Sequence, residues 1–504
     1  MRIAYCASVA VLAALIWAAP AGAADLLVLD KDGRVHARTD AAVPRTVLPV
    51  PPRRTVRRPS VAAIATASKT ARRKRAKRRT VMGELRRLER RGALASEDFA
   101  GRRAAWKDAV RRSRRLGGTR GTEMRAVVAT IKDIAARRQL TASRVVPLWL
   151  TLERNLEWWT EGRSIGSGQR VEFEGSELVW QYYPGQGLQL QMLGNFGKLN
   201  ALWSSKRRND ELSAMADELI AVAVGRAGGL AWEYYFEFNG GRAPWVSGMA
   251  QGTAVQSLSR AAVRLDRQAD VLPVAQQALA IFEAPTPQGV RVPGEVGDHY
   301  ALYSFAPAFR VINGFTQALV GLFDYAELSG DPRGLALFEA GDREARRELP
   351  SFDTGAWSLY SRGSLTRESD FSYHDLLTGF VVNLCKRTGA EVYCSTADRF
   401  REYESTPPEI TVGSRRIRGG RDGRVRFELS KISNVSLRIT RGSRVIESRP
   451  FGTVGYGKRT FGWEDVPRRA GEYTVRLDAT DLAGNSASTE QVVEVLKPKR
   501  KRRP

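Results

Sequence analysis

The sequence predicts a multidomain, mainly α protein in which an α/α toroid with a small β region precedes a C-terminal β-sandwich. Three observations lead to this fold class. Apolar residues recur at helical spacing in paired segments between residues 81 and 405, interrupted by an alternating stretch at about 164–195. After Pro407-Pro408 the pattern becomes short alternating strands. The length of 504 residues also exceeds that of one ordinary domain.

The first 23 residues have the three parts of an export signal. A basic start, Met1-Arg2, is followed by an apolar run from Ile3 to about Ala19 and then by the small residues 21–23. We therefore expect a signal peptide over 1–23 and a protein that is secreted or held at the cell surface. An uncleaved N-terminal anchor is the alternative.

Residues 24–80 have the composition of a basic, disordered linker. Five prolines punctuate the segment, and residues 41–80 hold thirteen Arg and Lys with no Asp or Glu. Such a chain repels itself and buries little apolar surface. The net charge of +26 favours polyanionic partners, among them an anionic polymer of the cell envelope. We do not expect nucleic acid as a partner, because the basic runs, including the tail at 498–504, lack interleaved aromatics.

Helical spacing defines the middle of the chain. It predicts a helical segment over 81–160, where Val145 to Trp159 forms one apolar helix. In the β part at about 164–195, apolar residues alternate with polar or small ones. Further helices are expected at about 247–265, from Asn313, at 373–384 and at 397–403, and their pairing predicts the toroid.

Short alternating strands with turns about every ten residues fill 408–497, which predicts an Ig-like β-sandwich serving as a spacer or attachment module. Upstream of it, Cys385 and Cys394 flank a glycine-containing turn. Export implies an oxidising environment, so we expect them to form a disulfide between two helices, with two free buried thiols as the alternative. Only three histidines occur, so no metal site is expected.

One stretch, Trp232 to Arg260, combines features suited to binding. An aromatic, strand-like segment leads through Gly240-Gly241 into a helix start, where free N–H groups suit an anion. Arg242 could pair bidentately with a carboxylate or sulfate. Ordinary packing explains the same pattern equally well.

The motif Trp245-x-Ser247-x-Met249-Ala250-Gln251-Gly252 resembles the hallmark of the C-terminal domain of D-glucuronyl C5-epimerases. Further similar segments follow in the family's order: an Asn-Gly-Phe helix at 311–325, an Asp-Thr-Gly segment at 349–360 and the pair Tyr373-His374. The resemblance covers about residues 145–405 and marks 161–405 as the catalytic region.

The resemblance implies inversion at C5 of a hexuronate within an acidic polysaccharide, without a redox cofactor. One group removes the C5 proton and another returns a proton to the opposite face. It places Tyr360 and Tyr373 at the reaction centre, with Tyr303 at a further family position. The candidate substrate contacts are Tyr182, Tyr183, Lys198, Asn200, Arg242, Trp245, Gln251, Arg310, Asn313 and His374.

One departure bears on catalysis. The family carries a catalytic glutamate immediately before the position of Tyr303, and this sequence has Leu302. Glu295 or Asp298 could replace it through a shifted loop, with His299 another candidate. Tyrosines alone could serve, for example in a β-elimination. Alternatively, the site only binds uronate polymers. The leading function is therefore hexuronate C5-epimerisation, with a non-catalytic glycan-binding protein or a polysaccharide lyase as alternatives.

Overall fold

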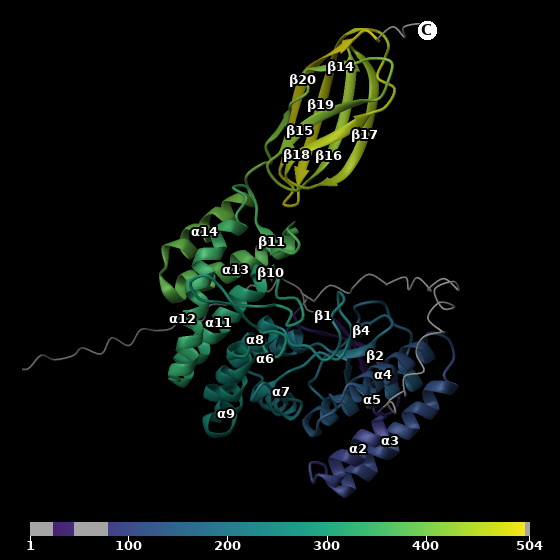
Figure 1. The fold of residues 1–504 in the computed structure, drawn as a ribbon, viewed down its shortest axis with the longest axis vertical. Helices are drawn as coiled ribbons and strands as arrows, with labels where there is room; N and C mark the ends of the chain where they lie inside the picture. The colour runs from purple at the N-terminus through teal and green to yellow at the C-terminus, as the bar shows by residue number, and fades with distance from the viewer. Residues whose placement is uncertain (1–23, 45–78, 499–504) are drawn as a thin grey trace, which may run out of the picture. The chain divides into compact units, whose positions relative to one another are not determined.

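The computed structural model describes residues 24–44 and 79–498 (Figure 1). These residues fall into two compact units. The first unit contains the described residues up to Gly225 together with Leu230–Trp245 and Ser257–Ala275. The second contains Arg226–Gly229, Val246–Gln256 and the described residues from Gln276 onward. The predicted signal peptide, linker residues 45–78 and tail residues 499–504 lie outside the described residues.

A five-stranded sheet with the order β2-β1-β3-β4-β5 lies in the first unit. Its strands are β1 (Ala24–Leu29), β2 (Val35–Asp40), β3 (Arg170–Phe173), β4 (Trp180–Tyr183) and β5 (Gly187–Leu190). The β part expected at about 164–195 is therefore present. The assignment of residues 24–44 to a disordered linker is wrong, because β1 pairs with β3 in parallel and buries Leu26 and Leu29.

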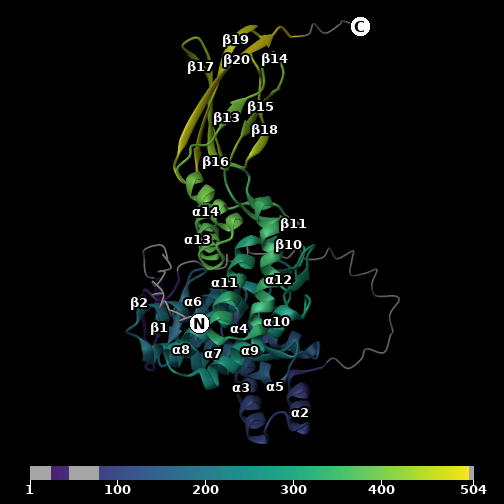
Figure 2. The ribbon, with the colours of Figure 1, turned by 90° about the vertical axis from the view of Figure 1, so that its left-hand side faces the viewer.

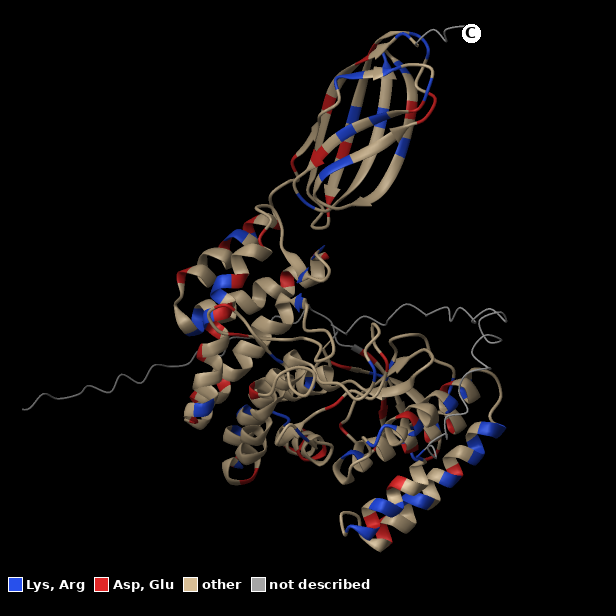
Figure 3. Ribbon diagram, in the orientation of Figure 1, with Lys and Arg blue, Asp and Glu red and all other residues tan. Residues whose placement is uncertain are grey.

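Helices form most of the rest of the first unit: α2 (Val81–Arg90), α3 (Ser96–Arg115), α4 (Gly118–Ala136), α5 (Ala142–Glu161), α6 (Met192–Ser205) and α7 (Asn209–Ala221), with a small hairpin of β6 (Val224–Arg226) and β7 (Gly229–Ala231) where the two units meet in sequence. Thr80 and Thr141 cap the N-termini of α2 and α5 through their hydroxyls. Lys and Arg recur along α3 (Figure 3), whose last turn carries three arginines that suit the negative end of the helix dipole.

The helical part of the second unit alternates helices with short strands. Its elements are α9 (Gln268–Ala278), α10 (Ala280–Glu283), β8 (Arg291–Pro293), β9 (Asp298–Tyr300), β10 (Phe309–Val311), α11 (Ile312–Ser329), α12 (Pro332–Glu348), η1 (Leu349–Phe352), β11 (Leu359–Gly363), β12 (Arg367–Glu368), α13 (Phe371–Thr388) and α14 (Glu391–Tyr403), while α8 (Gly248–Arg264) and α9 carry residues of both units.

The prediction of a mainly α fold with an α/α toroid is wrong. The predicted helices exist, and α11 packs against α12 and α13 while α13 packs against α14. However, the sheets β10-β11-β12 and β8-β9 interrupt the helix pairs, and a closed ring of helices is not shown by the described residues. The chain is a mixed α and β protein, because segments too short to score as strands from sequence alone pair over long sequence distances.

Residues after 408 form two sheets around one apolar core (Figure 2). One sheet has the order β13-β15-β18 and the other β14-β20-β19-β16-β17. The strands are β13 (Ile410–Val412), β14 (Arg416–Arg418), β15 (Gly423–Leu429), β16 (Ser433–Arg441), β17 (Arg444–Val454), β18 (Gly457–Trp463), β19 (Gly471–Asp481) and β20 (Ser486–Leu496). Because residues of both sheets share the core, this part is a β-sandwich; its Ig-like class stays a prediction.

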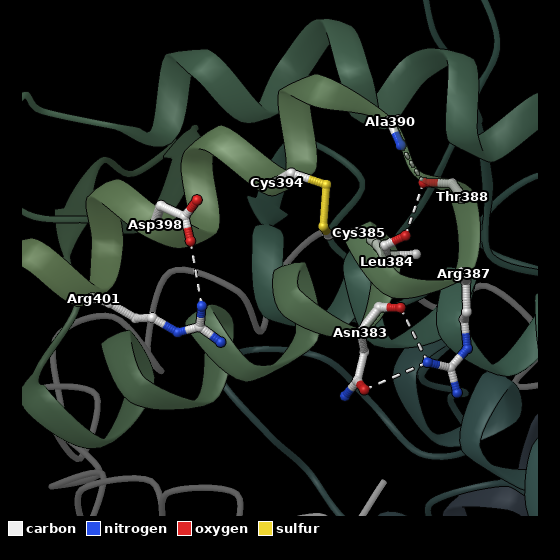
Figure 4. Close-up of a disulfide and its surroundings, with 9 residues drawn as sticks. All are labelled: Asn383, Leu384, Cys385, Arg387, Thr388, Ala390, Cys394, Asp398 and Arg401. Carbon is white, nitrogen blue, oxygen red and sulfur yellow. Dashed lines mark hydrogen bonds and ion pairs between the residues drawn. A yellow bond between two sulfur atoms is a disulfide. The ribbon is translucent and has the colours of Figure 1, made fainter. Parts of the chain in front are cut away.

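The disulfide predicted between two helices is present in the structure (Figure 4). Cys385 near the end of α13 is bonded to Cys394 in α14, across a turn in which Gly389 adopts a left-handed conformation. Nowhere in the described residues is there a helix with the length and apolarity to cross a membrane.

Candidate active site

Three tyrosines from different elements meet in the second unit. Tyr360 lies on β11, Tyr373 in the first turn of α13, and Tyr303 in the loop between β9 and β10. The ring centroids of Tyr360 and Tyr373 are 4.7 Å apart, and Tyr303 is hydrogen-bonded to Tyr360. The ring of Phe309 stacks on Tyr303 and also approaches Tyr360, so the phenols share one aromatic environment.

Local backbone features set the positions of the Tyr360 and Tyr373 side chains. The pairing of β11 with β12 shifts register between Leu359 and Ser361, so Tyr360 occupies a β-bulge, a device that redirects a side chain. Asp370 caps α13 by accepting the N–H of Tyr373 at 2.9 Å. Nδ2 of Asn313, in the first turn of α11, donates to the carbonyl of Tyr373 at 2.9 Å. Both tyrosines are thus fixed by neighbouring elements rather than by flexible loops.

Burial keeps the phenols protonated near neutral pH. It raises the pKa of Tyr360, while the hydrogen bond from Tyr303 and the positive charge of Arg367 oppose that rise. Burial also raises the pKa of Tyr373 strongly, and an ionised Tyr360 would raise it further. Only one phenol of the pair can therefore ionise readily, and Tyr360 has the neighbours that help it to do so.

Leu302 is buried, with 3% of its surface exposed, and its side chain lies directly against Gly314 of α11. Glu295 and Asp298, the candidates to replace the glutamate that the family carries at position 302, each interact with an arginine instead. The Glu295 side chain is 75% exposed and pairs with Arg347 at 3.2 Å. Asp298 is oriented toward Arg291, with 3.8 Å between the charged atoms.

A buried ionic network holds both ends of the loop that carries Tyr303. Nδ1 of His299, the middle residue of β9, lies 3.0 Å from Oε2 of Glu348, while Arg310 on β10 pairs with Oε1 of the same carboxylate. Burial lowers the pKa of His299, and Glu348 opposes that change. Arg310 is therefore paired with a residue of α12. Glu348, which the sequence analysis did not identify, connects the two strands on either side of the Tyr303 loop.

His374 follows Tyr373 in sequence but serves the packing of α13. Its Nδ1 lies 2.8 Å from the hydroxyl of Ser358 and its Nε2 lies 2.9 Å from the carbonyl of Phe400. Trp357 stacks on the imidazole at 3.7 Å, and burial lowers the pKa of His374 to about 4. A neutral imidazole with both nitrogens engaged cannot supply the charge that a tyrosine base needs.

The aromatic candidates of the first unit are core residues. The hydroxyl of Tyr182 donates to Glu123 at 2.9 Å, and Tyr183 stacks on Phe236. Trp245 is 1% exposed, stacks on Tyr234 at 4.2 Å and donates its indole N–H to the carbonyl of Phe236. Gln251 of α8, in the second unit, is also fully buried.

The polar candidates of the first unit pair with side chains of their own unit. Lys198 is fully buried and forms ion pairs of 3.0 and 2.9 Å with Glu172 and Glu177, so its placement does not support a substrate contact. Arg242 pairs with Asp133 at 2.7 Å, and Asn200 accepts a hydrogen bond from Arg260. The partners lie far away in sequence, which is why the sequence pattern missed them. Within residues 24–44 and 79–498, no cluster of three His, Cys, Asp or Glu is arranged to hold a metal ion.

Comparison with known proteins relates the same part of the chain to one family. Residues 228–402 match the sequence profile described as "D-glucuronyl C5-epimerase C-terminus". A D-glucuronyl C5-epimerase of Caenorhabditis elegans is 28% identical over 284 residues, which is 51% of this chain and 44% of that protein. An uncharacterised protein of Methanocaldococcus jannaschii is 25% identical over 34% of this chain and 58% of its own length. The chain thus matches about half the length of these curated relatives.

Among solved structures, an engineered protein is similar over 74% of this chain and 85% of its own length, at 12% identity and a TM-score of 0.16. A Cellulomonas fimi endo-beta-1,4-mannanase double mutant covers 73% of this chain and 84% of its own length, at 11% identity and a TM-score of 0.13. These scores are too low to carry an argument about fold.

Proposed function

We propose that this protein inverts C5 of hexuronate residues in an acidic polysaccharide, because residues 228–402 match the profile of the D-glucuronyl C5-epimerase C-terminus. The observation that carries the proposal is the contact between Tyr360 and Tyr373, whose ring centroids lie 4.7 Å apart. Inversion needs two proton-transferring groups close to one carbon, and these two phenols come from different elements to the same place.

In the proposed reaction the ionised Tyr360 removes the C5 proton, and the bonding electrons move into the uronate carboxyl group to form an enediolate. The phenol of Tyr373 then delivers a proton to C5 from the opposite face, which inverts the centre. The oxidation level does not change, since one proton leaves C5 and one returns. Tyr360 ends as the phenol and Tyr373 as the phenolate, and proton exchange with solvent restores the starting state before the next turnover. Tyr303, hydrogen-bonded to Tyr360, stabilises the phenolate.

A second candidate function is non-catalytic binding of an acidic glycan, and the observation that favours it is Leu302. A buried leucine against Gly314 supplies no proton where the family carries a glutamate. In this alternative the tyrosines pack against a sugar face without transferring protons. The net charge of +26 fits an acidic polymer in both cases.

One experiment separates the candidates. The full chain is incubated in heavy water with a D-glucuronate polymer, and deuterium at C5 is measured by NMR and mass spectrometry. An epimerase incorporates deuterium at C5 and yields L-iduronate-type residues, whereas a lyase yields unsaturated ends that absorb in the ultraviolet. A binding protein does neither but is retarded on a uronate column. Retardation without exchange would therefore reject the epimerase proposal.

We also propose that the protein works outside the cytoplasm, secreted or at the cell surface. The export signal predicted for residues 1–23 and the disulfide between Cys385 and Cys394 both suit an oxidising compartment. Fractionation of cells that produce the full chain, with detection of the mature N-terminus by mass spectrometry, tests this. Finding an intact Met1 on a cytosolic protein would reject it.

A further inference from the structure

The strand that neighbours Tyr360 is attached to the β-sandwich through one carboxylate. Glu368 on β12 lies opposite Leu359 in the ladder of β11 and β12, directly beside the bulge at Tyr360. Its two oxygens accept the backbone N–H groups of Ile432 and Tyr456, each at 2.8 Å. Both donors belong to turns of the sandwich, between β15 and β16 and between β17 and β18.

A buried lysine makes the second attachment. Lys431 is 1% exposed, and its ammonium group pairs with Asp481 of the sandwich at 2.7 Å. The same group donates to the carbonyls of Tyr403 at 2.7 Å and of Thr406, at the C-terminal end of α14. All three ammonium protons are thereby used, and the positive charge lies at the negative end of a helix dipole.

Lys431 also contacts the aromatic residues that pack beside Tyr373. Its ammonium group lies 5.4 Å from the ring of Trp357, which stacks on His374, the residue after Tyr373. The indole N–H of Trp357 donates at 3.0 Å to the carbonyl of Ser369, the residue after Glu368. The two attachments therefore converge on the segment from 357 to 374, which holds both tyrosines.

We propose that the sandwich positions the tyrosine pair, with Glu368 and Lys431 as positioning residues that hold the bulged strand and the start of α13. This assigns the module a role beyond that of a spacer, and its catalytic part rests on the proposed function. The physical reason is that β12 contains only two residues and sits at the edge of its sheet, where pairing alone is weak. The two N–H bonds to the Glu368 carboxylate supply the missing constraint.

Amide hydrogen exchange of the full chain tests, independently of activity, whether the contacts of Glu368 with the sandwich hold β11, β12 and the start of α13 in place. Glu368→Ala removes both acceptors, Glu368→Gln keeps one oxygen, and Glu428→Ala, which removes an exposed carboxylate of β15, is the matched control. We expect amide exchange over 359–373 to rise about tenfold or more in Glu368→Ala and less in Glu368→Gln, with the sandwich core unchanged. Wild-type exchange over 359–373 in both variants would overturn the proposal.

Kinetics then test the consequence for the tyrosines. In Glu368→Ala, kcat for C5 deuterium exchange should fall by about tenfold to a hundredfold while KM stays within about twofold, because the phenols are misplaced and the binding surface is not. Glu368→Gln should recover part of the loss. Increased amide exchange with wild-type kcat would overturn the positioning role. Absence of C5 exchange in the wild type would reject the proposed function instead. The amide exchange data would still decide whether Glu368 holds residues 359–373 in place.

Discussion

The phenol rings of Tyr360 and Tyr373 lie 4.7 Å apart although one is on a bulged strand and the other begins a helix. Burial raises the pKa of both phenols, and an ionised Tyr360 would raise the pKa of Tyr373 further. The pair is suited to hold one negative charge at a time. That property is what a base and an acid acting in sequence require.

Replacing either phenol by phenylalanine should abolish exchange while leaving binding intact. Tyr360→Phe and Tyr373→Phe each remove a proton-transferring group but keep the ring, so kcat for C5 deuterium exchange should fall by about 10²- to 10⁴-fold. Retention on a uronate column should change little. The matched control is Tyr473→Phe, a buried tyrosine of the sandwich. Near wild-type exchange in both active-site variants would reject the assigned roles.

The hydrogen bond from Tyr303 should appear in the pH dependence of the rate. A base acts when ionised, so the rate should rise with pH toward the pKa of Tyr360, which burial raises and Tyr303 lowers. Tyr303→Phe removes a hydrogen bond to the phenolate, so kcat at neutral pH should fall by about tenfold to a hundredfold and recover at higher pH. The test is a pH–rate profile. An unshifted profile would show that Tyr303 does not tune Tyr360.

Restoring a carboxylate at position 302 should increase activity. The Leu302 side chain is buried beside Gly314, in the first turn of the helix that also contacts Tyr373. Leu302→Glu should raise the exchange rate about tenfold or more, and Leu302→Gln, of the same size but unable to transfer a proton, should not. Both variants should lose about 1–3 kcal/mol of unfolding free energy because a polar group is buried. Equal rates in the two variants would contradict the prediction.

The sequence predicted local elements better than their assembly. Helices around Asn313, Tyr373 and Ala397 follow from apolar spacing, and the disulfide follows from a nine-residue separation across a turn. The toroid failed because the short strands β8 to β12 pair through backbone groups that leave little trace in residue type. Strands β1 and β2 do not follow from composition, because residues 24–80 are basic and rich in proline on average although the segment begins with a buried apolar run.

At the candidate site, too, the sequence predicts individual residues better than the contacts between them. The family motif predicts Tyr360 and Tyr373 as site residues, and the contact between them arises only once β11 and α13 are folded. The sequence predicts Lys198 as a substrate contact, and the fold gives it two carboxylate partners, Glu172 and Glu177, which lie 26 and 21 residues away in sequence. A buried lysine with two carboxylates and a surface lysine facing a ligand have the same local sequence pattern, so only the fold distinguishes them.

Stability should depend on pH through His374. Its pKa is lowered from 6.5 to about 4 in the folded chain, so between these values the unfolded state binds a proton that the folded state does not. The stability that the neutral His374 contributes is fully present above about pH 6.5 and is lost as the pH falls. The loss of unfolding free energy reaches about 3 kcal/mol near pH 4. Urea unfolding of wild type and His374→Gln at both pH values measures this difference. An identical loss in the variant would contradict it.

The disulfide should stabilise the end of α13 without affecting catalysis. Cys385 and Cys394 are nine residues apart, so the bond closes a short loop, and replacing both by serine should cost about 2–3 kcal/mol of unfolding free energy. Tyr373 lies in the first turn of α13, about 18 Å along the helix axis from Cys385. We therefore expect denaturant unfolding at lower urea with kcat within about twofold of wild type. A large loss of kcat in the still-folded serine variant would show that the α13–α14 turn is coupled to the tyrosine pair.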